Sequence, residues 1–287
     1  IYNNDYGFND GEINIEADNF YGTAPIFESN YKRISVNIKD VSINSGNGLF
    51  AYVTSPVGAN ININVDNIYS TSTATGGWPP GFIELGAAAG YPSSNSKLTV
   101  NIGNAEMNKR TGKLFTLGSP SEVSTNNSIV YNVGNFRQVN KESLTDPYDP
   151  SILDLGAFSF TNDDNSGTFT RIKTTLNCNN FVSDIGIQSF YNLNTFNECT
   201  FVFDIDNCTN RKMPTINMIA GNTFNNCKII LRGNYVNTSG YPILKIEGVT
   251  LNNTQIILDG NFTSDGKVVE CLSATLDANS AIILNGT

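Results

Sequence analysis

A short motif repeats in register along the C-terminal part of the chain. Its four copies read TFNEC, TFNNC, TLNNT and TLDAN, and they begin at positions 195, 223, 250 and 275, so the period is 25 to 28 residues. Each copy leads into an apolar run. A period of this size indicates an architecture in which each unit buries its apolar face only against its neighbours. Because the unit is β-rich, contains many Asn and Gly residues and shows no helical periodicity, we predict a parallel β-helix.

Two interleaved series of apolar segments carry the repeat toward the N-terminus. One series includes VNIKDV at 36 and VNIGNA at 100, and the other includes GLFAYV at 48 and GFIELG at 81. Alternate side chains of a strand face opposite sides, so the apolar residues supply inward rungs, while Asn and Asp face outward or occupy corners. The expected fold class is all-β, a β-solenoid of about nine to ten turns. Its register predicts one stacked column, formed by Val36, Ile63, Val100, Tyr131, Leu176, Phe203, Leu231 and Leu258.

The spacing of the repeats divides the chain into three parts. Residues 1–33 are expected to form a lead-in segment and a first short turn, residues 34–175 turns with long loop insertions, and residues 176–287 regular turns. All three belong to one continuous domain, which we expect to be a fragment of a longer protein. Insertions in a solenoid map to loops, often on one binding face. The insertion-bearing turns are therefore the expected place of function.

Two long insertions are predicted to flank a groove. The segments STSTATGGWPPG (70–81) and RQVNKESLTDPYDPS (137–151) leave from the same side of their turns. Those turns lie on either side of a turn whose own loop, MNKRTGK (107–113), is shorter and basic. Two strand spacings, about 10 Å, would separate the long loops. Two raised loops with a low basic loop between them would form a short groove.

The inserted segments carry side chains that suit saccharide recognition. Trp78 is the only tryptophan and precedes two prolines, so an exposed indole there could stack on the apolar face of a sugar ring. Tyr91 and Tyr148 could do the same. Each of these rings could instead pack its loop onto the coil, as most large aromatic side chains do. Lys109 and Arg110 could pair with acidic sugars or balance the acidic loops.

Three carboxylates are the candidate catalytic residues. Glu142, Asp146 and Asp149 lie in one loop, and a pair of carboxylates about 5–10 Å apart is what glycoside hydrolysis requires. The same aspartates next to proline are also ordinary turn residues. The chain contains no histidine, which excludes Ser-His-Asp chemistry and the usual zinc sites. No cofactor or metal is expected, and an enzyme of this kind would be a carboxylate-dependent glycosidase or polysaccharide lyase.

The five cysteines are predicted to be reduced. Cys199 and Cys227 occupy the same place in successive repeats, where the next two copies have Thr254 and Asn279. A column of small buried side chains explains this spacing better than a disulfide does, because free cysteine is among the most buried residue types. We therefore expect Cys199 and Cys227 to be stacked, inward-pointing and unbonded.

The charge of the chain restricts its partners. The formal net charge is −9, which disfavours nucleic acid and anionic membrane surfaces, because both select basic patches. The chain also lacks an apolar run of about 18 residues, so membrane insertion is not expected.

The irregular early turns followed by regular Asn-stacked turns resemble the pectate-lyase-like right-handed single-stranded parallel β-helices, and most of all a bacteriophage tailspike or receptor-binding tail protein. The resemblance implies a right-handed coil, a homotrimer, attachment to other virion tail proteins and recognition of a host cell-surface polysaccharide. It also implies a location on a virion or in the extracellular space. No catalytic motif of the family can be carried over to this sequence. A polysaccharide-degrading enzyme and a bacterial surface adhesin remain alternatives.

Overall fold

The computed structural model shows an all-β chain. Over the residues that it describes, the chain forms β-strands joined by corners and loops and no helix. The described residues are 9–22, 26–29, 31–43, 51–53, 57–70, 83–85, 93–107, 115–118, 123–138, 158–161, 167–184, 186–190, 193–219, 221–238 and 240–287.

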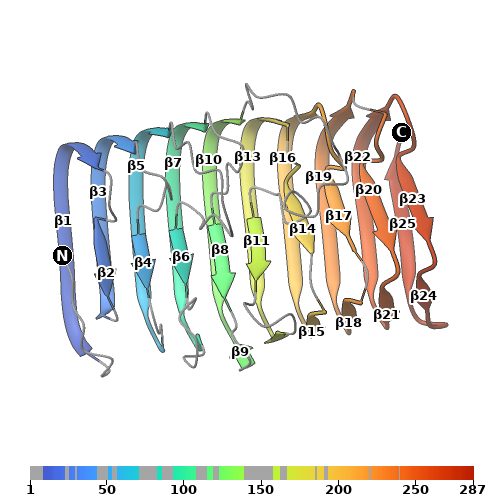
Figure 1. Cartoon of the computed structure of the whole chain (residues 1–287), viewed down its shortest axis with the longest axis horizontal. Helices are drawn as coiled ribbons and strands as arrows, with labels where there is room; N and C mark the ends of the chain where they lie inside the picture. The colour runs from blue at the N-terminus through green and yellow to red at the C-terminus, as the bar shows by residue number, and fades with distance from the viewer. Residues whose placement is uncertain are drawn as a thin grey trace.

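The strands form three parallel sheets, which the chain visits in turn (Figure 1). The ten-stranded sheet contains, in order, β1 (Asn9–Gly22), β3 (Tyr31–Ile43), β5 (Asn60–Ser70), β7 (Lys97–Met107), β10 (Ser128–Gln138), β13 (Lys173–Ser183), β16 (Thr200–Asn210), β19 (Lys228–Asn237), β22 (Gln255–Ser264) and β25 (Ala281–Gly286). The nine-stranded sheet contains β2 (Phe27–Ser29), β4 (Ala51–Val53), β6 (Ile83–Leu85), β8 (Phe115–Gly118), β11 (Phe158–Thr161), β14 (Gln188–Phe190), β17 (Ile216–Met218), β20 (Leu244–Glu247) and β23 (Val269–Leu272). The six-stranded sheet contains β9 (Val123–Thr125), β12 (Thr168–Thr170), β15 (Thr195–Asn197), β18 (Thr223–Asn225), β21 (Thr250–Asn252) and β24 (Thr275–Leu276).

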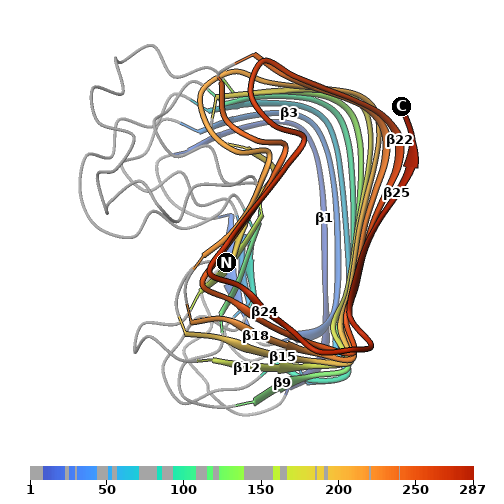
Figure 2. The ribbon, with the colours of Figure 1, turned by 90° about the vertical axis from the view of Figure 1, so that its right-hand side faces the viewer.

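Each strand pairs with the strand of the same sheet one repeat away, and this arrangement is consistent with a β-solenoid. Seen from its end, the strands of one sheet lie behind one another around a common interior (Figure 2). The predicted register is confirmed, because every neighbouring pair in the expected column is paired. The pairs run from Val36 and Ile63 to Leu231 and Leu258.

The long strands bend once, and the bend is visible in their burial pattern. In β7, Leu98, Val100 and Ile102 are buried and alternate with outward residues, but Gly103 and Asn104 are both exposed before burial resumes. Two consecutive outward residues mean that the strand turns a corner and then continues along a second side of the core. A Cβ atom at Gly103 would lie 2.5 Å from the carbonyl oxygen of Asp66, so this corner requires a residue without a side chain.

Asparagine ladders stabilise the outer surface of the ten-stranded sheet. Asn64 donates to the side-chain oxygen of Asn37 at 2.7 Å, and Asn101 donates to Asn64 at 2.7 Å. Asn132 and Asn177 extend the same column at 2.8 Å per bond. Stacked amides of this kind add a hydrogen bond between successive strands of a parallel sheet.

The cysteines match the prediction, with one correction to their column. All five are free thiols, and Cys199 and Cys227 are buried in adjacent repeats. Burial raises the pKa of another of them, Cys178, to about 12, which makes its thiolate scarce at neutral pH. After Thr254, the column continues with Ser280 and not with Asn279, because the Ser280 hydroxyl accepts from the Thr254 N–H at 3.0 Å. A turn closed on the Asp277 carboxylate adds one residue at this corner.

Two buried tyrosines differ in whether their hydroxyl groups are hydrogen-bonded. The Tyr235 hydroxyl donates to the carbonyl of Phe203 at 2.7 Å, whereas the Tyr131 hydroxyl has no hydrogen-bond partner among the described residues. An unsatisfied buried polar group costs about 1–3 kcal/mol, whereas a satisfied one contributes about 1 kcal/mol. We expect Tyr131→Phe to raise the free energy of unfolding by about 1 kcal/mol and Tyr235→Phe to lower it by a similar amount, measured by urea unfolding.

The pH dependence of the same variants gives a second readout. Burial raises the pKa of both phenols well above the usual value. The unfolded chain therefore releases these protons first, and stability should be complete below about pH 10 and fall as the pH rises further. Each Tyr→Phe variant should show a shallower alkaline loss than the parent chain. An unchanged alkaline slope in both variants would contradict the assignment.

Candidate functional site

A groove of about 540 Å³ lies on the outer face of the ten-stranded sheet. It crosses β1, β3, β5, β7 and β10 beyond the corner, near the C-terminal ends of these strands. At the register position of Tyr21, each of the five strands contributes one lining residue. The groove is therefore built from columns of side chains that run across the strands. These columns are fixed by the repeat and need no loop to place them.

The outer column of the groove contains two exposed tyrosines. Tyr21 pairs with Ser42, Ser42 with Tyr69, Tyr69 with Glu106, and Glu106 with Arg137. The side chain of Tyr21 is 77% exposed and that of Tyr69 is 44% exposed, which is unusual for large rings on a sheet whose inward residues are buried. The two tyrosines are two strand spacings apart, about 10 Å, with the small Ser42 between them. The column therefore has two aromatic ridges separated by a gap.

The inner column of the groove is a second asparagine ladder. Asn67 donates to Asp40 at 2.8 Å, Asn104 donates to Asn67 at 2.9 Å, and Asn135 donates to Asn104 at 2.8 Å. An asparagine amide has two N–H donors and two acceptor lone pairs, and each ladder bond uses one of them. The amides are held in fixed orientations by these bonds. They present hydrogen-bonding groups at intervals of one strand spacing alongside the tyrosines.

The predicted site residues lie outside the described residues. This holds for all of them: Trp78, Tyr91, Lys109, Arg110, Glu142, Asp146, Tyr148 and Asp149. The groove nevertheless adjoins them in sequence, because β5, β7 and β10 end at Ser70, Met107 and Gln138, where the segments that carry most of these residues begin.

The sequence interpretation missed Tyr21 and Tyr69. Both occupy an outward position at the end of a long strand, where the alternation predicts a polar side chain; Tyr21 follows the partly buried Phe20, and Tyr69 follows the buried Ile68. The signal available in the sequence for these two residues was an aromatic side chain at an outward position of the alternation.

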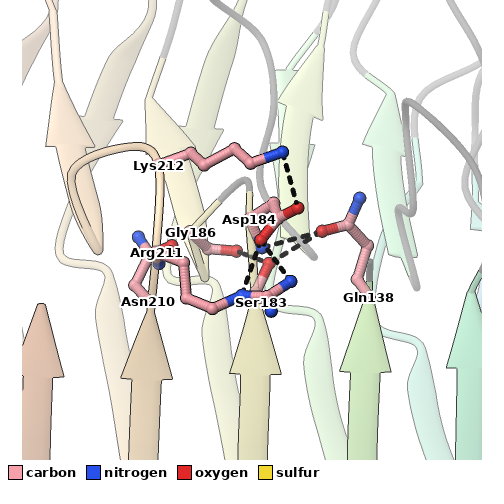
Figure 3. Close-up of polar contacts among 7 residues, drawn as sticks. All are labelled: Gln138, Ser183, Asp184, Gly186, Asn210, Arg211 and Lys212. Carbon is pink, nitrogen blue, oxygen red and sulfur yellow. Dashed lines mark hydrogen bonds and ion pairs between the residues drawn. The ribbon is translucent and has the colours of Figure 1, made fainter. Parts of the chain in front are cut away.

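A second polar cluster lies at a corner of the coil (Figure 3). Asp184 follows the last residue of β13, and its carboxylate is only 1% exposed. It accepts from the Arg211 guanidinium at 2.6 and 2.8 Å and from the Lys212 ammonium at 3.1 Å, and both cations follow the end of β16. From the opposite side, Gln138 at the end of β10 accepts the Asp184 backbone N–H at 2.9 Å. The Asp184 cluster thus ties together the corners of three successive repeats.

Other classes of site are not visible in the part of the chain that the structure describes. That part contains no group of three or more His, Cys, Asp or Glu side chains that could hold a metal ion. None of the described segments forms a helix of the length and apolarity that a membrane span requires. No protein family, curated protein or solved structure matches this chain.

Proposed function

We propose that this chain is a right-handed parallel β-helix of about nine to ten turns that binds a saccharide in the groove beside Tyr21 and Tyr69. The observation that carries the proposal is the pair of exposed tyrosine rings, two strands apart, beside a ladder of oriented amides. The handedness is supported by the rule that parallel strands in one sheet are joined by right-handed crossovers in nearly all cases.

The chemistry of the groove suits a sugar more than an apolar ligand. An exposed tyrosine combines a flat apolar face with a polar hydroxyl, and a sugar ring combines apolar C–H faces with a polar rim. The sugar rings can stack on the tyrosines while the sugar hydroxyls bond to the side-chain amides of Asn67 and Asn104. A site with a few fixed polar groups beside aromatic surface is typical of small-molecule recognition.

The wider role that fits this site is that of a viral tail protein, on a virion or in the extracellular space. In that role the chain would bind a host cell-surface glycan, assemble as a homotrimer and attach to other tail proteins. The repeat pattern, in which irregular early turns precede regular ones, resembles that of tailspike proteins and is the basis for this role. The net charge of −9 favours neither nucleic acid nor an anionic membrane as a partner. A glycan-cleaving enzyme that uses Glu142, Asp146 or Asp149, and a bacterial adhesin, remain alternative hypotheses.

Alanine variants of the two tyrosines test the proposal. We expect Tyr21→Ala and Tyr69→Ala each to weaken binding to the recognised glycan about tenfold, as loss of a stacking ring corresponds to roughly 1.4 kcal/mol. Binding would be measured on an array of immobilised oligosaccharides. Leu193→Ala is the control, because Leu193 is 57% exposed but lies outside the groove.

The same array separates the groove from the inserted loops. If Trp78→Ala abolishes binding and both tyrosine variants bind normally, the loops carry recognition and the groove does not. Loss of oligomerisation in Trp78→Ala with intact binding would instead identify the loop as an assembly surface.

A further inference from the structure

The charged groups of the groove are arranged unevenly. Among the described residues that line it, Asp40 and Glu106 are acidic and Arg137 is the one basic residue. Glu106 pairs in register with Tyr69 on one side and with Arg137 on the other. In strand order, Glu106 therefore lies between Arg137 and the nearer tyrosine, Tyr69. The position of Glu106 is one strand spacing from that of Tyr69, and the position of Arg137 is two.

The remaining polar groups of the groove are uncharged amides. Asn67, Asn104 and Asn135 each offer both donors and acceptors, so they suit ligand groups that also donate and accept. Sugar hydroxyls and N-acetyl groups have this dual character, whereas a carboxylate or sulfate only accepts. An acidic ligand would leave the acceptor oxygens of the ladder unused and would face the field of a chain with net charge −9.

We propose that the groove selects an uncharged glycan, built of hexoses or N-acetylated hexosamines, over a polyanionic one, and that Glu106 determines this choice. The inference rests on the proposed saccharide binding. In this arrangement the glycan lies across the strands, with two of its rings against Tyr21 and Tyr69 and its hydroxyl and acetamido groups on the amide ladder. Glu106 acts by repelling an anionic substituent at the ring beside Tyr69, since like charges in close contact disfavour the wrong ligand.

The test compares neutral oligosaccharides with uronate-containing, sialylated and sulfated ones on one array, at low and at physiological salt. The parent chain should bind neutral glycans. Glu106→Gln should raise the ratio of anionic to neutral glycan binding about tenfold at low salt. Asp259→Asn is the matched control, because it removes the same charge from β22 of the same sheet, outside the groove.

Each outcome decides one point. Binding of anionic glycans in preference to neutral ones by the parent chain would overturn the charge selection while leaving saccharide binding intact. An equal gain of anionic binding in Glu106→Gln and Asp259→Asn would show that net charge acts and Glu106 does not. Absence of binding to every glycan on the array would overturn the proposed function itself.

Discussion

The double substitution Arg211→Ala/Lys212→Ala should lower the free energy of unfolding by about 3–5 kcal/mol. The reason is the asymmetry of burial in the Asp184 cluster. The Asp184 carboxylate is 1% exposed, whereas the side chains of Arg211 and Lys212 are 38% and 37% exposed. Removal of both cations leaves a carboxylate in a buried corner without these two counter-charges, and this is the costly way to break an ion pair.

Substitution of the acid should cost less than substitution of its partners. In Asp184→Asn the two cations can turn to solvent, and the neutral amide still fills the corner, so we expect a loss of about 1–2 kcal/mol. Arg232→Ala is the control, because Arg232 contacts Asp204 and Asp259 at 3.8 and 3.7 Å but is 49% exposed. A surface pair of this kind contributes under about 1 kcal/mol. Urea unfolding of the three variants would contradict the argument if Asp184→Asn proved the most destabilised.

Phe196→Ala should be comparably damaging, with a loss of about 3–5 kcal/mol. Phe196 is fully buried and stacks between Phe169 and Phe224, with centroid separations of 5.2 and 4.8 Å. Phe190 and Phe201 meet it edge-on. Truncation removes the ring that these four share, and a rigid parallel sheet cannot close over the space.

A second pair of variants checks that the loss of Phe196 comes from the cavity. Phe196→Leu keeps much of the volume and should recover more than half of the stability that Phe196→Ala loses. Leu193→Ala, at an exposed position three residues earlier, should change stability by no more than about 0.5 kcal/mol. A loss below about 1 kcal/mol in Phe196→Ala would mean that the stacked rings repack freely.

The register of the fold was predictable because it depends on inward residues. An apolar side chain at every second position, repeated once per strand, allows one alignment of Val36 with Ile63 and of Leu231 with Leu258. A slip of one residue would turn the whole apolar set outward. The correction from Asn279 to Ser280 arose at a corner, where the core imposes no alternation and a turn on Asp277 adds a residue.

The candidate site was not predictable to the same degree, because outward residues are not constrained by the core. Tyr21 and Tyr69 lie far apart in sequence, and only the register of β1, β3 and β5 places them on either side of Ser42. The Asp184 cluster was not predicted from the sequence, for a similar reason. Its acid and its two cations follow the ends of different strands, where sequence alone does not indicate which charges meet. The residues predicted on the inserted segments remain predictions.

Pairing between adjacent repeats also bears on how such a chain folds and how it can change. In the described residues each strand pairs only with strands one repeat away, so the separation of contacting residues does not grow with chain length. The ladder bond from Asn177 to Asn132 spans 45 residues and that from Asn207 to Asn180 spans 27. Chain-closure entropy rises only with the logarithm of loop length, so the longer span costs about 0.5 kcal/mol more. Folding can therefore begin at any repeat and spread to its neighbours. Surface loops can also change in length or sequence without altering the strand register.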